Sequence, residues 1–92
     1  MVSHQFRLYV AGSSVNSVQA IANLQALCLE LLPGRHRIEV IDILREPGRA
    51  LADGILLTPA LKRLTPLPVR TIVGNLSERE AVLQALGLSV RV

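Results

Sequence analysis

Few side chains in this sequence are of the types that carry out catalysis. The 92 residues contain one cysteine, Cys28, so no Cys-x-x-Cys pair is available for thiol-disulfide exchange. Cys28 also falls on the apolar stripe of a predicted helix, where a free cysteine usually acts as a small buried hydrophobic group. A redox protein that uses Cys28 alone is therefore only an alternative hypothesis, and a search for mixed disulfides would test it.

The histidines and aspartates are spaced too widely to indicate a metal site or a catalytic carboxylate pair. His4 lies near the N-terminus and His36 in a predicted loop, and neither is next to a cluster of Cys, Asp or Glu. A metal site needs several converging ligands, so we expect none. Asp42 ends a predicted strand and Asp53 precedes a glycine, and local capping or ion pairing explains Asp42 better than catalysis does. We expect no catalytic residues and no cofactor.

Phosphate and nucleic acid are poor candidates for a ligand. Gly12-Ser13-Ser14 follows the first predicted strand but lacks the spacing and the lysine of a P-loop. The formal net charge is +3 and nine of the ten basic residues are arginine, which favours an acidic partner. However, the chain has one Tyr, one Phe and no Trp to stack on bases, and its arginines are scattered. An acidic protein surface is therefore the better candidate.

Three basic side chains flank a predicted hairpin between residues 59 and 73. Lys62, Arg63 and Arg70 are candidates for contact with an acidic partner, because the planar guanidinium of arginine pairs with carboxylates in a bidentate way. The alternative is an ordinary solvated basic face, since exposed ion pairs contribute only about 0 to 1 kcal/mol.

Hydrophobic periodicity predicts one α/β domain over residues 1–92. The expected strands are residues 6–11, 37–44, 60–64 and 68–73, and the expected helices are residues 17–31, 47–53 and 78–86. Ser13, Ser14 or Asn16 can cap the first helix. Ser77 and Glu80 fit a capping box at the start of the last helix, and Gly87 can end that helix with a left-handed residue.

The composition favours a cytoplasmic protein without membrane association. Half of the residues are hydrophobic, which suffices for one core. The longest apolar stretches are interrupted well before the roughly 18 residues that span a bilayer. The first five residues show neither the basic nor the apolar region of a secretory signal, and a lone thiol fits a reducing compartment.

The order strand, helix, strand, helix, strand, strand, helix resembles a thioredoxin-like domain without its redox pair. Thr58-Pro59 precedes the third strand, where that fold keeps a cis proline. An X-Pro bond adopts the cis form at a cost of about 0.5 to 1 kcal/mol, against roughly 2.5 to 4 kcal/mol for other residues.

Several short motifs together resemble the KaiB family of circadian clock proteins. They are Leu8-Tyr9-Val10-Ala11-Gly12, Asn16-Ser17-Val18, Val40-Ile41-Asp42, Leu57-Thr58-Pro59, Pro66-Leu67-Pro68-Val69-Arg70 and Gly74-Asn75-Leu76-Ser77-Glu78-Arg79-Glu80. The resemblance runs over residues 6–88, and the combination is far more specific than any single motif.

The resemblance implies a non-enzymatic regulator that binds a KaiC-like ATPase, in a circadian clock or in related stress and adaptation responses. Contact through the edge of the second strand and through the basic hairpin is expected. Further implied partners are KaiA or a sensor histidine kinase, where the host has them, and other copies of the chain in a dimer or tetramer. A self-associating interaction module is a further alternative, because an exposed strand edge can pair with another chain.

The resemblance also implies a metamorphic protein, in which a second fold rearranges the C-terminal half. The residues expected to matter for this switch are Pro59, Pro66, Pro68, Gly74, Ala85 and Gly87. Residues 78–86 are mostly strong helix formers, and Ala85 stands where the family has glycine. Alanine favours a helix over glycine by roughly 0.8 to 1 kcal/mol. We therefore expect the thioredoxin-like fold to be more populated here than in a typical clock member.

Overall fold

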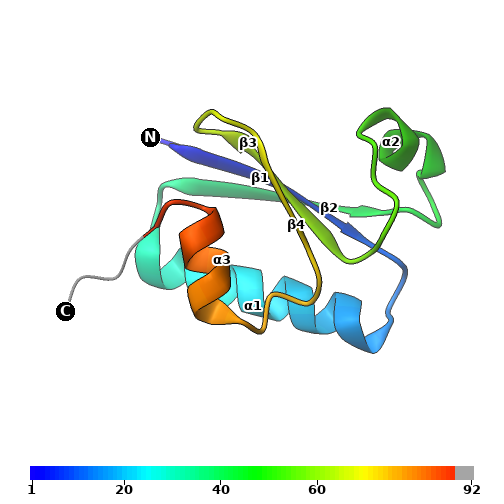
Figure 1. The fold of residues 1–92 in the computed structure, drawn as a ribbon, viewed down its shortest axis with the longest axis horizontal. Helices are drawn as coiled ribbons and strands as arrows, with labels where there is room; N and C mark the ends of the chain where they lie inside the picture. The colour runs from blue at the N-terminus through cyan, green and yellow to red at the C-terminus, as the bar shows by residue number, and fades with distance from the viewer. Residues whose placement is uncertain (89–92) are drawn as a thin grey trace.

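A four-stranded sheet forms the centre of the computed structural model, which describes residues 1–88. The elements in chain order are β1 (His4–Val10), α1 (Val15–Leu31), β2 (His36–Asp42), α2 (Pro47–Ala52), β3 (Ala60–Thr65), β4 (Arg70–Val73) and α3 (Arg79–Ala85). The strand order is β2-β1-β3-β4, with β1 and β2 parallel and the other two pairings antiparallel. Figure 1 shows α1 and α3 on one side of the sheet and α2 on the other.

The alternation of side chains along β1 divides the core into two clusters. Phe6, Leu8 and Val10 face α1 and α3, where they pack with Leu24 and other buried residues. Tyr9 faces the opposite side and belongs to a smaller cluster with Ile41, Ala50 and Ala60. Successive residues of a strand point to opposite faces, so one strand supplies both clusters.

β1 and β2 start earlier than their hydrophobic patterns predict. His4 is aligned with His36 in the parallel pairing of the two strands, and the register continues to Val10 and Asp42. His36 therefore lies at the start of β2, and its expected place in a loop is wrong. Backbone pairing extends a strand beyond its apolar residues because it needs no particular side chain.

The ends of α1 follow local sequence signals. Ser14 is the N-cap, and its side chain accepts a hydrogen bond from the backbone N–H of Ser17. The helix ends at Leu31, just before Pro33 and Gly34. Of the three caps considered from the sequence, the structure selects Ser14.

The prediction for the start of α3 is wrong, and the prediction for its end is confirmed. The predicted capping box is wrong, because Glu78 is the N-cap and makes no side-chain capping bond. The N–H of Ser77 instead donates to the side chain of Asn75, at 3.0 Å. At the other end Gly87 has φ +69°, and the N–H groups of Gly87 and Leu88 donate to the carbonyls of Gln84 and Leu83. This pair of bonds is a Schellman motif, so the predicted role of Gly87 is confirmed.

Prolines shape the hairpin between β3 and β4. The Thr58-Pro59 bond is cis, as the sequence predicts, and the bonds before Pro66 and Pro68 are cis as well. β4 begins at Arg70 rather than at Pro68. A proline has no N–H to donate to the neighbouring strand, which explains the later start. No helix within residues 1–88 is long and apolar enough to cross a membrane.

Candidate partner-binding surface

Cys28 lies in the core, as its place on the apolar stripe of the predicted helix indicates. Its side chain is 0% exposed and packs in the cluster between the sheet and α1. Burial raises the pKa of the Cys28 thiol to about 11. The nucleophilic form of cysteine is the thiolate, so both the burial and the raised pKa weigh against a reactive cysteine.

The predicted local role of Asp42 is confirmed. Its carboxylate accepts hydrogen bonds from the backbone N–H groups of Gly12 and Leu44, both at 3.0 Å. These bonds, with a smaller contribution from Arg45, hold the pKa of Asp42 below its usual value. Asp42 thus joins the end of β2 to the turn that follows β1. Within residues 1–88 no three His, Cys, Asp or Glu side chains are grouped as metal ligands would be.

Arg63 is buried, although its sequence context placed it among the candidate contact residues. It is 5% exposed, and its guanidinium donates to the backbone carbonyls of Leu86 and of Pro68. A cation at the C-terminal end of α3 is favourable, because the free carbonyls there carry partial negative charge. Burial and the nearby charge of Arg70 lower the pKa of Arg63. These contacts join β3 to the end of α3 and to the proline turn.

Lys62 and Arg70 differ from Arg63, and from each other, in their contacts and exposure. The ammonium of Lys62 is 3.3 Å from the backbone carbonyl of Asp53 and 3.8 Å from the Asp53 carboxylate. Arg70 is exposed at the start of β4. The three cations do not form one basic face, since neighbouring residues of β3 point to opposite sides of the sheet. Their contact with a partner stays a prediction, and Arg70 is the exposed member of the three.

Arg70 adjoins two exposed apolar side chains at the tip of the hairpin. Leu67 is 77% exposed and Val69 is 46% exposed. We call Leu67, Val69 and Arg70 the hairpin-tip surface. Two exposed apolar side chains of a proline-containing turn, followed by an exposed cation at the start of β4, are suited to contact an acidic protein surface.

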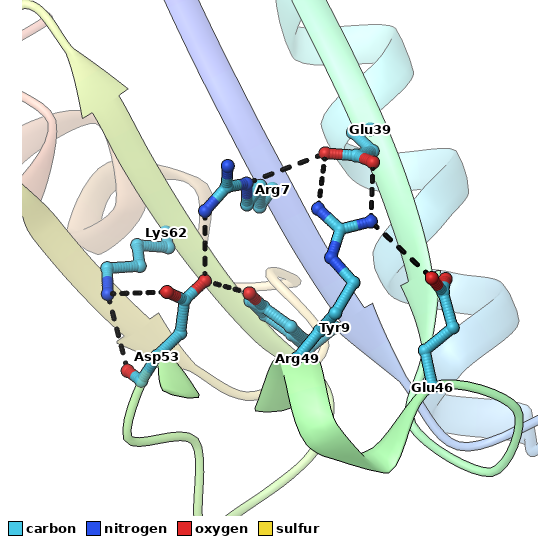
Figure 2. Close-up of polar contacts among 7 residues, drawn as sticks. All are labelled: Arg7, Tyr9, Glu39, Glu46, Arg49, Asp53 and Lys62. Atoms are coloured by element: carbon cyan, nitrogen blue, oxygen red, sulfur yellow. Dashed lines mark hydrogen bonds and ion pairs between the residues drawn. The ribbon is translucent and has the colours of Figure 1, made fainter. Parts of the chain in front are cut away.

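A network of charged residues on the α2 side of the sheet was not predicted from the sequence. Figure 2 shows its members, which are Arg7, Tyr9, Glu39, Glu46, Arg49, Asp53 and Lys62. Arg49 of α2 forms a bidentate pair with Glu39 of β2, at 2.7 and 2.9 Å. Arg7 of β1 lies between the two carboxylates, 3.5 Å from Glu39 and 3.1 Å from Asp53.

Asp53 is the centre of the other half of this network. Its carboxylate accepts hydrogen bonds from the hydroxyl of Tyr9 and from Arg7. The Tyr9 bond, followed by Arg7 and Lys62, lowers the pKa of Asp53. The same environment, mainly through burial, raises the pKa of Tyr9 to about 12. The network attaches α2 and the segment after it to three strands, and it neutralises most of the cations on this face.

The remaining residues singled out for fold switching occupy turns and helix ends. Pro59 is buried directly before β3, and Gly74, with φ +121°, follows β4. A φ in that region favours glycine. Ala85 is the exposed last residue of α3. Their part in a change of fold stays a prediction.

Two solved structures that are similar to this chain confirm the thioredoxin-like fold. Mitochondrial thioredoxin 3 from Saccharomyces cerevisiae aligns with a TM-score of 0.74 and 12% identity, over 96% of this chain and 81% of that one. The N-terminal domain of Synechococcus elongatus SasA aligns with a TM-score of 0.67 and 20% identity, over 100% of this chain and 90% of that one.

Relatives found by their sequence have higher identities to this chain than these two structures have. The circadian clock protein KaiB3 of Synechocystis is 43% identical over 91 residues, which cover 94% of this chain and 89% of the relative. The circadian clock oscillator protein KaiB of Synechococcus elongatus is 46% identical over 82 residues, covering 89% and 80% respectively. The family model of the KaiB domain matches residues 7–88. With relatives this similar along most of its length, and with the thioredoxin-like fold described above, this chain belongs to the KaiB family.

Proposed function

We propose that this protein is a non-enzymatic regulator that binds a KaiC-like ATPase in the cytoplasm. The observation that carries the proposal is the match of the KaiB domain across residues 7–88. Relatives that are 43 to 46% identical are named circadian clock proteins, which supports a role in timing or in a related adaptation response. The protein acts by occupying its partner rather than by chemistry, and the buried, protonated thiol of Cys28 agrees with this.

The hairpin-tip surface is the docking site in this proposal. Arg70 supplies the charge, and Leu67 and Val69 supply apolar area on the same turn. Arg63 supports the surface from inside, because it holds the carbonyl of Pro68 at 2.8 Å. An acidic patch on the ATPase is the complementary surface. KaiA or a sensor histidine kinase would be further partners where the host has them.

Binding to the purified KaiC-type ATPase of the same host tests the proposal. We expect association by biolayer interferometry in at least one nucleotide state, and we expect Arg70→Glu to weaken it about tenfold or more by reversing the charge at the contact. The matched control is Arg45→Glu, since the Arg45 side chain is 87% exposed on a different part of the surface. No association with ATP or with ADP would refute the proposed partner. Equal effects of the two variants would refute the docking site only.

A further inference from the structure

The strand β4 forms one border of the sheet, as β2 forms the other. In the described part of the chain, β4 (Arg70–Val73) pairs only with β3. The N–H of Gly74, directly after β4, donates to the carbonyl of Pro59 at 2.9 Å. Because hydrogen-bonded and non-hydrogen-bonded pairs alternate along an antiparallel ladder, the backbone groups of Thr71 and Val73 point away from β3. An open edge of this kind can accept another strand.

A groove of about 290 Å³ lies between this edge and α3. Its lining includes Ile72 of β4, Ala81 and Val82 of α3, and Glu78 at the start of α3. Val82 belongs to the main core cluster and Ile72 packs against it, so the floor of the groove is apolar. The groove can therefore receive an apolar side chain from a strand that pairs with β4.

Two charges without ion-pair partners lie at the ends of this edge. Arg70 is exposed at the start of β4, and Glu78 is exposed beside the groove. Neither forms an ion pair with another described residue. Arg70 is aligned with Arg63, whose side chain reaches the end of α3, so Arg70 and the alternate residue Ile72 face the α3 side of the sheet. The cation, the apolar floor and the carboxylate thus follow one another on one face.

The order of these groups specifies the kind of segment that fits. We propose that β4 and its groove bind an extended segment of a partner protein that carries a basic, an apolar and an acidic residue at alternate positions, in that order along the segment. In an antiparallel pairing the acidic residue lies opposite Arg70 and the apolar residue lies opposite Ile72, at the groove. The basic residue then lies opposite Gly74, near Glu78.

Backbone bonds and side-chain complementarity both contribute to this binding. A strand that adds to a sheet edge gains affinity from main-chain hydrogen bonds and specificity from pockets that receive alternate side chains. Opposite charges that face each other across an antiparallel pair stabilise it, and like charges destabilise it. Antiparallel pairs are somewhat more stable than parallel ones, which sets the direction of the segment. A contact with one short strand is small beside the roughly 1,200 to 2,000 Å² of stable complexes, so we expect reversible binding.

A synthetic peptide tests the site on the full chain. The probe is a short peptide with blocked ends in which lysine, valine and glutamate alternate with threonine. On titration we expect shifts of the backbone amide signals of Thr71 and Val73, and slower hydrogen exchange of these two amides. A second peptide with lysine in place of the glutamate should bind about tenfold more weakly, because like charges then meet at Arg70. This test does not depend on whether a KaiC-like ATPase binds the protein.

Charge reversals in the protein give matched controls. Arg70→Glu should weaken binding of the first peptide about tenfold and should strengthen binding of the second by a similar factor. Glu78→Lys should weaken both peptides, since both carry the lysine that lies near Glu78. Arg45→Glu should change neither affinity, because the Arg45 side chain is 87% exposed on a different part of the surface. Circular dichroism checks that each variant is folded.

Several results would overturn the proposal. They are a lack of shifts along β4 at millimolar peptide, equal affinities of the two peptides, an Arg70→Glu variant that does not favour the second peptide, and shifts confined to the β2 edge. Charges that only protect the edge from pairing would give the first of these results. Signals of Thr71 and Val73 that change when the chain alone is diluted would assign the edge to a second copy, and would also overturn it.

A spin label on the peptide tests the direction of pairing. With a nitroxide at the N-terminal end of the first peptide, we expect the amide signal of Gly74 to broaden more than that of Arg70. The reverse order would contradict the antiparallel arrangement.

Discussion

Arg63 shows how one charged side chain can hold this domain together from inside. It is 5% exposed and donates to two carbonyls, one at the end of α3 and one in the proline turn. Hydrogen bonds from charged groups contribute more than neutral ones, and removing Arg63 takes the donor away from the buried bond to the Leu86 carbonyl. Arg70, aligned with it on the next strand, is exposed.

We expect Arg63→Ala to lower the free energy of unfolding by about 2 to 4 kcal/mol, through the loss of charged hydrogen bonds and of buried packing. Arg70→Ala should change it by less than about 0.5 kcal/mol, as is usual at exposed positions. Urea denaturation of both variants measures the difference. Similar values for the two would mean that the Arg63 contacts contribute little.

Cys28 should be unreactive in the folded protein. Burial prevents access and raises the pKa of the thiol to about 11, so little thiolate exists at pH 8. A thiol reagent such as DTNB should react with Cys28 at the rate of unfolding, and the rate should rise steeply in urea. Fast reaction without denaturant would return the redox alternative to consideration.

At the scale of elements, α2 is short and depends on contacts with the sheet. Its six residues bury Ala50, while Arg49 and the following Asp53 reach charged side chains of three strands. Several of these contacts require the Asp53 carboxylate to be ionised. Its pKa is lowered in the folded protein, first by the bond from Tyr9.

This network predicts a dependence of stability on pH. Because the pKa of Asp53 is lower in the folded state, its contribution is fully present above the ordinary value of 3.8 and is lost as pH falls through the lowered pKa. Asp53→Asn should therefore be less stable than wild type at pH 7 and should show a flatter loss of stability below pH 4. Because Glu39 and Asp42 also have lowered pKa values, the free energy of unfolding of the variant will still fall to some extent at low pH. Urea denaturation at a series of pH values measures both profiles, and parallel profiles would contradict this role of Asp53.

At the scale of the whole molecule, the C-terminal half is where a second fold would differ. In the thioredoxin-like fold α3 ends in the Schellman motif at Gly87, and Val82, Leu83 and Leu86 are buried against the core. Ala85 is the last helical residue and is exposed, so its substitution acts on helix propensity with little effect on packing.

We expect dilute protein to show helical backbone chemical shifts across residues 79–85. Ala85→Gly should move the population toward an extended conformation of this segment by up to about fivefold, since glycine costs roughly 0.8 to 1 kcal/mol relative to alanine in a helix. Gln84→Ala, also exposed in α3, is the control and should not increase the extended population. Extended shifts in the wild type would refute the predicted preference for the thioredoxin-like fold.

Local patterns in the sequence were sufficient for the seven elements, the helix end at Gly87 and the family resemblance, because each depends on residues close together in the chain or on strand and helix periodicity. They narrowed the cap of the first helix to three residues, of which the structure selects Ser14. Tertiary contacts decided the rest. The side chain of Asn75 accepts the hydrogen bond from the N–H of Ser77, and no capping box forms. Arg63 is buried because its acceptor, the carbonyl of Leu86 at the end of α3, is 23 residues away in the chain. Arg7 and Asp53 are 46 residues apart in the chain. Their pairing, like the open edge of β2, depends on how the strands are ordered in the sheet, and no short stretch of sequence contains that order.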